Sequence, residues 1–312
     1  MAASPDPMLG APQSHQAEAP LPPTTSQVEV GKRYPLRVGG ALRGKVGANS
    51  ALIGGVLIVG TVVLLAILAG LVSPHDPLEQ EIGNTLAAPR SPGHPLGTDQ
   101  LGRDVLSRLL YAARTDLFVA FAALVCPLFI GTVLGIVAGY RGGIFDSLLV
   151  GVIDVIIAFP VLILLIALVF VLGPGIGTII ISITVVDWVV YARLARTTAR
   201  REATMEYILA ARVGGLPARR ILVRHILPNI ISQSIVYAMS DAVVIILTVT
   251  SLGFLGLGVP PPSPDWGTMI AEAQPYFTTH WWLAVIPGAT IVVTALGLSL
   301  IADGLAEKLD AR

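Results

Sequence analysis

The stretch ALIGGVLIVGTVVLLAILAGLV (residues 51–72) decides the class of this protein, because its 22 residues include no charged side chain. A helix needs roughly 20 apolar residues to cross the hydrocarbon core of a bilayer. Only 13 % of the whole chain is charged, against about 25 % in an ordinary soluble domain. The chain is therefore predicted to be an all-α, polytopic membrane protein.

Five further apolar stretches bring the predicted number of membrane-spanning helices to six. In the second span, Gly131, Gly135 and Gly139 repeat every four residues, a spacing that predicts close packing against another helix. Before that span, the polar segment 73–116 ends in a run with the apolar repeat of a helix. The predicted spans are residues 51–72, 117–140, 147–172, 176–192, 230–258 and 281–301.

The arginines predict how the chain lies in the membrane. Eight of its 20 Lys and Arg residues lie within 193–229, and such clusters mark cytoplasmic segments. The flank before the first span is basic as well, so both termini are expected in the cytoplasm, with 73–116 outside. The location expected is the plasma membrane of a bacterial cell.

Composition divides the chain into three parts. Residues 1–45 are rich in Pro, Ala, Ser and Gln without an apolar repeat, which predicts a disordered tail that ends in a basic flank. A transmembrane permease-like domain is expected over residues 46–305. Residues 306–312 form a short charged tail, expected in the cytoplasm.

Acidic residues inside predicted spans are candidates for function. An acid at the bilayer centre costs about 2.5–3.5 kcal/mol on insertion scales, so it should face protein or water. Asp241, its neighbour Ser240, and Asp154 could line a substrate path or relay protons. Asp154 and Asp187 could equally be structural partners of an arginine or of a helix end.

Signals for catalysis or for bound cofactors are missing from the sequence. The nearest match to a phosphate-binding loop is GGALRGKV (residues 39–46), where Val46 occupies the position that needs Ser or Thr. No His or Cys cluster has metal-ligand spacing. We therefore expect a non-catalytic chain without a metal site or a cofactor of its own.

The arginine-rich stretch EYILAARVGGLPARRILVRHILPN (residues 206–229) has further features that its charge does not explain. Residues 202–213 are predicted to form a short helix, and its alanines would let that helix seat closely in a partner's groove. Gly214 and Gly215 should end the helix in a left-handed turn. Pro217 is suited to the first turn of a second helix.

The spacing from Ala210-Ala211 through Gly215 to Leu227-Pro228 resembles the EAA loop of ABC-importer permeases. Leu209 replaces the motif's Glu and His225 its Ile, with Glu206 one turn earlier as a candidate substitute. The resemblance narrows to C-type permeases of the dipeptide, oligopeptide and nickel importers. It does so through HPLGTDQLGRDVLSRLLYAARTDL (94–117), WVVYARLAR (188–196), RHILPN (224–229) and LGFLGLGVPPPSPDWGTMI (252–270).

This resemblance implies the fold of a type I ABC-importer permease and an assembly of several chains. A second permease, two ATPase subunits or domains and an external substrate-binding protein are the partners it implies, within membrane lipids. ATP and Mg²⁺ would be bound by the ATPases, and no nucleic acid is expected. The residues implied to couple to an ATPase are Glu206, Ala210, Ala211, Arg212, Gly214, Gly215 and Leu216.

The sequence leaves two other functions open. The chain could be a proton-coupled secondary transporter that uses Asp154 and Asp241, or a membrane scaffold without transport. For an importer, the solute could be a dipeptide, an oligopeptide, a nickel complex or another small molecule.

Overall fold

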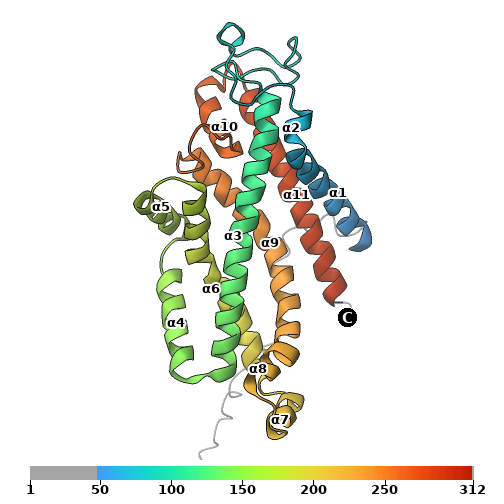
Figure 1. Cartoon of the computed structure of the whole chain (residues 1–312), viewed down its shortest axis with the longest axis vertical. Helices are drawn as coiled ribbons and strands as arrows, with labels where there is room; N and C mark the ends of the chain where they lie inside the picture. The colour runs from blue at the N-terminus through green and yellow to red at the C-terminus, as the bar shows by residue number, and fades with distance from the viewer. Residues whose placement is uncertain (1–47, 311–312) are drawn as a thin grey trace, which may run out of the picture. The chain divides into compact units, whose positions relative to one another are not determined.

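The computed structural model describes residues 48–310, and its regular structure there is helical (Figure 1). This range excludes the predicted tail at 1–45 and the phosphate-loop match at 39–46. It also excludes the last two residues of the predicted tail at 306–312. The α-helices are α1 (Ala48–Ile67), α2 (Ala69–Val72), α3 (Val105–Arg141), α4 (Gly143–Ile157), α5 (Val161–Leu172), α6 (Ile176–Glu202), α7 (Glu206–Val213), α8 (Ala218–Ile221), α9 (Leu227–Phe254), α10 (Trp266–Ala273) and α11 (Trp282–Asp310). Short helical turns are η1 (Ile82–Asn84), η2 (Leu222–Ile226) and η3 (Gln274–Tyr276).

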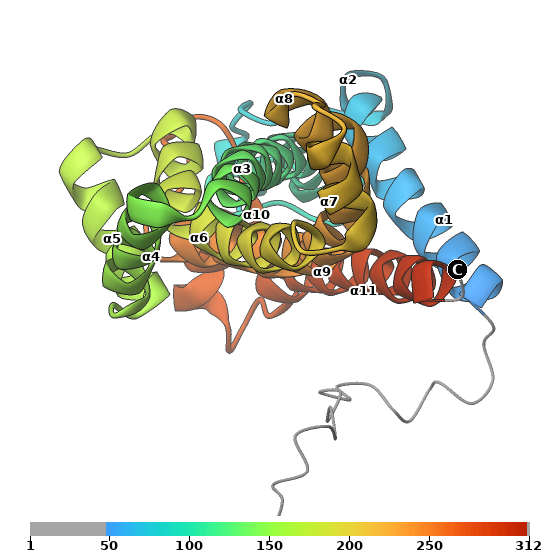
Figure 2. The ribbon, with the colours of Figure 1, turned by 90° about the horizontal axis from the view of Figure 1, so that it is seen from below.

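The predicted class, an all-α polytopic membrane protein, is confirmed. Within residues 48–310, five helical runs are long and apolar enough to cross a membrane, and the α4–α5 pair brings the number to six if it counts as one span. Seen from below (Figure 2), α3, α6 and α9 lie together, with α4 and α5 on one side and the α1–α11 pair on the other.

The predicted span at 147–172 is not one straight helix. It is divided into α4 and α5, whose axes differ in direction by 91°. Pro160 lies at the break and explains it, because its ring clashes with the carbonyl group of residue 156 and it has no N–H to donate. A proline also disfavours the helical conformation of the residue before it, here Phe159. The helix α4 ends shortly before that residue, at Ile157.

Several helices are longer than the apolar stretches that predicted them. The span predicted at 117–140 belongs to α3, whose 37 residues rise about 55 Å, well beyond the hydrocarbon thickness. It begins at Val105 because the Asp104 side chain accepts a hydrogen bond from the Ser107 N–H and caps the helix. Likewise α6 continues past residue 192 and α11 past residue 301.

The glycine repeat of α3 packs against α6, as the sequence predicted. A Cβ atom built on Gly135 would collide with the carbonyl oxygen of Ala192 and approach the Ala195 Cβ to 2.9 Å. Gly131 and Gly139 meet the backbone of α6 in the same way, one turn to either side. The two helices therefore touch backbone to backbone along three turns.

At the other end of α3, buried ion pairs join the 73–104 segment to α10. Arg103 donates to Asp99 Oδ2 at 2.6 Å and to Glu272 Oε2 at 2.8 Å. Arg108 bonds to the same two carboxylates and is almost fully buried. Removing one member of such a buried set typically costs about 3–5 kcal/mol, because its partner is left as an uncompensated charge.

The glycine contact makes a prediction that a matched pair of variants can test. Gly135→Ala should destabilise the protein by about 1–3 kcal/mol, because the added methyl group forces α3 away from α6. Gly151→Ala places the same methyl group inside α4, where nothing lies within 4 Å, and should stabilise by up to about 1 kcal/mol. Thermal unfolding in detergent would measure both, and equal melting temperatures would contradict the proposed tight contact.

Candidate functional site

The candidate coupling segment is built around α7, which ends in a hydrogen-bonded glycine turn. Gly215 has a φ of +76°, the left-handed conformation that the sequence predicted. Its N–H donates to the Arg212 carbonyl at 3.1 Å, and the Leu216 N–H donates to the Ala211 carbonyl at 3.1 Å. These two bonds form a Schellman motif, which turns the chain sharply toward Pro217 and α8.

One face of α7 is anchored on the ends of the membrane helices. Ile208 is fully buried, and Ala211 and Leu216 pack beside it on an aliphatic cluster. This cluster draws on α3, α6, α8, η2 and α9, so α7 contacts all of these elements through one core. Its buried members are Ile136, Ala195, Ala199, Ile208, Ile221, Ile226 and Ile230.

The opposite face of α7 has no cover among the described residues. Val213 is 90 % exposed and Leu209 is 44 % exposed, and Ala210 lies between them at the surface. Glu206 precedes this row by one turn and is also exposed. The positions 206, 209, 210 and 213 follow the i, i+3, i+4, i+7 pattern by which a helix presents one face to a groove.

A polar network fixes α7 relative to α6 and α9. The Tyr207 hydroxyl donates to the carboxylate of Glu202, the last residue of α6. The Asn229 side chain, from the first turn of α9, donates to the same carboxylate at 3.3 Å. The hydrogen bond to Glu202 raises the pKa of Tyr207, so the hydroxyl keeps its proton at physiological pH.

This network changes the interpretation of the acids in the segment. Glu206 makes no hydrogen bond or ion pair with any other described residue, whereas Glu202 is buried and bonded. Sequence reasoning named Glu206 and missed Glu202, Tyr207 and Asn229. The spacing of Glu202 to Tyr207 across a helix break gives no periodic signal that could have revealed the pair.

Arg212 differs from the other arginines of the segment because it contacts an aromatic ring. Its guanidinium lies 5.2 Å from the ring centre of Tyr140, near the end of α3. Such a cation–π contact contributes about 0.5–1 kcal/mol at an exposed site. Arg212 therefore adds a second tie between α7 and α3.

A wider helical turn, η2, connects α8 to α9. It lies directly before Pro228, which has no N–H for the usual helical bond and whose ring crowds the carbonyl group of Arg224. Widening to a π turn relieves both conflicts without interrupting the chain's helical course. The helical run extends from Ala218 to Phe254, so it begins well before the predicted span at 230–258 and ends four residues before that span does.

A second candidate site is a pair of acids between α6 and α9. The Tyr191 hydroxyl donates to Asp241 Oδ2 at 2.7 Å, and Asp187 lies one helical turn before Tyr191 on α6. Tyr237 packs edge-on against Tyr191, with ring centres 5.2 Å apart. Asp187 Oδ2 is buried without a hydrogen-bond partner among the described residues.

The other predicted path residues lie elsewhere. Asp154 is exposed on α4, where it forms an ion pair with Arg193 at 3.4 Å. Ser240 is exposed on α9. Of the three, only Asp241 is buried, and its partner Tyr191 shares one face of α6 with Asp187 through their i, i+4 spacing.

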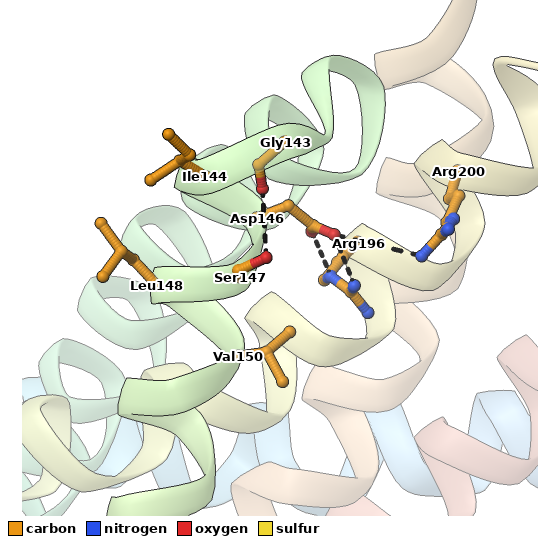
Figure 3. Close-up of a pocket in the computed structure, with 8 residues that line it drawn as sticks. All are labelled: Gly143, Ile144, Asp146, Ser147, Leu148, Val150, Arg196 and Arg200. Carbon is orange, nitrogen blue, oxygen red and sulfur yellow. Dashed lines mark hydrogen bonds and ion pairs between the residues drawn. The ribbon is translucent and has the colours of Figure 1, made fainter.

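An open groove of about 880 Å³ lies between α4 and α6, beside the same end of the helices as the α3–α4 turn (Figure 3). Arg196 holds Asp146 with two hydrogen bonds, one of 2.7 Å, and Arg200 approaches the same carboxylate at 4.0 Å. This bidentate pair ties α4 to α6, while Ile144 and Leu148 point outward from the groove's apolar side.

Comparison with known proteins gives a consistent result. Residues 131–312 match the family described as binding-protein-dependent transport system inner membrane component. The chain is 38 % identical over 269 residues to the di/tripeptide transport system permease protein DppC of Pseudomonas aeruginosa, covering 85 % of this chain and 89 % of that protein.

Two more relatives agree with the first. The dipeptide transport system permease protein DppC of Escherichia coli is 39 % identical over 269 residues, covering 85 % of this chain and 90 % of its own length. The oligopeptide transport system permease protein OppC of Bacillus subtilis is 35 % identical over 265 residues, covering 85 % and 87 %.

The glycine turn after α7 predicts different effects for neighbouring substitutions. Gly215→Ala should destabilise the turn by about 1–2 kcal/mol, because a side chain disfavours a positive φ even where space is open. Gly214→Ala is the control, since Gly214 has a φ of −69°. Hydrogen exchange of the peptide over 206–221 should speed up roughly 5- to 30-fold in the first variant. Equal exchange in both variants would contradict this account.

Proposed function

Because the chain belongs to the family of binding-protein-dependent transport system inner membrane components, we propose that it is the permease subunit of an ATP-driven importer of di- or oligopeptides. The peptide substrate is carried over from the names of the relatives. The permease would act beside a second permease, with two ATPase subunits or domains and an external substrate-binding protein. ATP and Mg²⁺ would be bound and hydrolysed by the ATPases.

The observation that carries the coupling part of this proposal is the two-sided character of α7. One face is fixed to α3, α6 and α9 through the aliphatic cluster, and the other exposes Leu209, Ala210 and Val213. A helix that is anchored on one side and apolar on the other suits a groove on a partner protein. The ATPase would push on this face, and the cluster would transfer the displacement to the membrane helices.

Leu209 fits this arrangement without the motif's Glu. The side chain lies on the exposed face, where a leucine adds apolar contact area with a partner. The buried carboxylate that organises the segment comes from Glu202 instead. Glu206 would lie at the rim of the same contact surface.

The proposed orientation places α7 in the cytoplasm, together with both termini. Arg200 and Arg201 are mostly exposed at the end of α6 nearest to α7, as the flank of a cytoplasmic segment would be. The 73–104 segment and α10 gather at the opposite end of α3 (Figure 1), which would face the binding protein.

A proton relay through Asp154 and Asp241 finds no support in the geometry. Asp154 is exposed in an ion pair with Arg193, while Asp241 is buried with Tyr191 and Asp187. Among the described residues, no side chain forms hydrogen bonds with both acids. The importer therefore remains the favoured function.

Changing the exposed face of α7 tests the coupling proposal. Val213→Glu should leave folding and membrane insertion intact, because Val213 is 90 % exposed. It should reduce peptide-stimulated ATP hydrolysis by the assembled complex at least about tenfold, since a carboxylate would be buried against apolar surface. Val213→Ile keeps the face apolar and should behave like the native chain. Native coupling in Val213→Glu would refute the proposed contact surface.

Asp154→Asn separates the importer from the proton-coupled alternative. An exposed ion pair contributes about 0–1 kcal/mol, so losing the Arg193 contact should change neither stability nor uptake by more than about twofold. Peptide uptake into vesicles would be measured with ATP and with a collapsed proton gradient. Uptake that needs the gradient and disappears in this variant would favour the secondary transporter.

A further inference from the structure

Three potential metal ligands meet in the 73–104 segment, at the opposite end of α3 from α7 (Figure 1). The side chains are those of His75, Glu81 and His94, and their ligand atoms all lie within 4.8 Å of one another. No short motif spacing in the sequence predicts this group, because irregular chain separates its members. The site is distant from α7, which packs at the other end of α3 (Figure 1).

His94 is oriented by a carboxylate on each side. Its Nδ1 lies 3.0 Å from Asp104 Oδ1, and its Nε2 lies 3.5 Å from Glu81 Oε2. A neutral imidazole has only one N–H, and donating it to Asp104 leaves a lone pair on Nε2 that faces the Glu81 oxygen. Two acceptors then face each other, an arrangement that a metal ion between them would satisfy.

The separation of these two atoms fits a metal ion. Zinc–nitrogen and zinc–oxygen bonds of about 2.0–2.2 Å place two tetrahedral ligands about 3.4 Å apart, close to the observed 3.5 Å. The same distance is long for a charge-assisted hydrogen bond, which is typically about 2.7–2.9 Å. The Asn84 side chain donates to this Glu81 oxygen at 2.7 Å and holds the carboxylate in place.

His75 supplies a third nitrogen next to this pair. Its ring stacks on His94 with centres 4.7 Å apart, and its Nδ1 is buried without a hydrogen-bond partner among the described residues. A buried ring nitrogen without a partner is costly unless something binds it. Its backbone is fixed as well, since the His75 N–H donates to Ser107 Oγ at 3.2 Å.

Asp104 organises both histidines. One of its oxygens orients His94 directly, and the other accepts hydrogen bonds from the Ser107 N–H and hydroxyl at 2.8 and 2.7 Å. Ser107 in turn holds His75. A carboxylate that fixes the tautomer and direction of a ligating histidine is the usual second layer of a zinc site.

From this geometry we propose that His75, Glu81 and His94 bind a divalent transition-metal ion, with zinc as the best match to two imidazoles and one carboxylate. A water molecule or an incoming ligand would complete the tetrahedron, because Glu81 and His75 are only partly buried. The ion would link the chain after α2, the η1 turn and the N-terminus of α3. The site is independent of the proposed transport function.

Zinc binding to the full chain tests this proposal. The protein would be purified in mild detergent through a tag without histidines, stripped with a chelator, and titrated with zinc against a chromophoric competitor. The native chain should bind one ion, and His75→Gln and Glu81→Gln should each weaken binding at least about tenfold. His280→Gln, at a histidine outside the cluster, is the matched control and should bind as the native chain does.

Folding and ligand identity are checked separately. Gel filtration would show that each variant remains monodisperse, and both changed residues are partly exposed, so their replacement should not unfold the chain. X-ray absorption of the loaded protein should show nitrogen and oxygen ligands only, with two imidazoles. No stoichiometric zinc binding, or equal affinity in His75→Gln and His280→Gln, would overturn the proposal.

Discussion

The backbone contact between α3 and α6 is the constraint on which the rest of the structure depends. Gly135 and its neighbours one turn away let the two helices approach until only glycine fits between them. In a membrane, apolar side chains gain little by leaving lipid, so helices associate through close packing of this kind. Once α3 and α6 are fixed as a pair, the face of α6 with Asp187 and Tyr191 is directed toward α9. There the Tyr191 hydroxyl donates a hydrogen bond to Asp241.

The same pair explains how a short surface helix could act on the whole membrane domain. The aliphatic cluster under α7 contains Ile136 from α3, Ala199 from α6 and Ile230 from α9. A displacement of α7 therefore reaches three helices through one packed core, and Glu202 adds a polar connection through Tyr207 and Asn229. This is a continuous set of contacts, which a mechanical account of coupling requires.

Three of the sequence-based predictions that the structure tests rest on composition, on a fixed period or on a local turn signal. The sequence predicted the helical membrane class, the packing role of Gly131, Gly135 and Gly139, and the left-handed turn at Gly215. It could not predict where helices end outside the bilayer, because polar residues continue a helix as well as apolar ones do; α3 and α6 show this. It also missed contacts between distant residues, such as Glu202 with Asn229 and His75 with His94, since no local pattern encodes them.

The two ends of α3 are held by different kinds of interaction, and this difference bears on where the protein would move. At the 73–104 end, Arg108 is buried between the Asp99 and Glu272 carboxylates, and separating such charges is costly and directional. At the α7 end an aliphatic cluster is joined by the Glu202–Tyr207–Asn229 network and the Arg212–Tyr140 contact, and among the described residues no ion pair links α7 to another helix. Rearrangement driven from α7 would therefore concentrate at its own end of the helices, while the ion-paired end stays together as one unit.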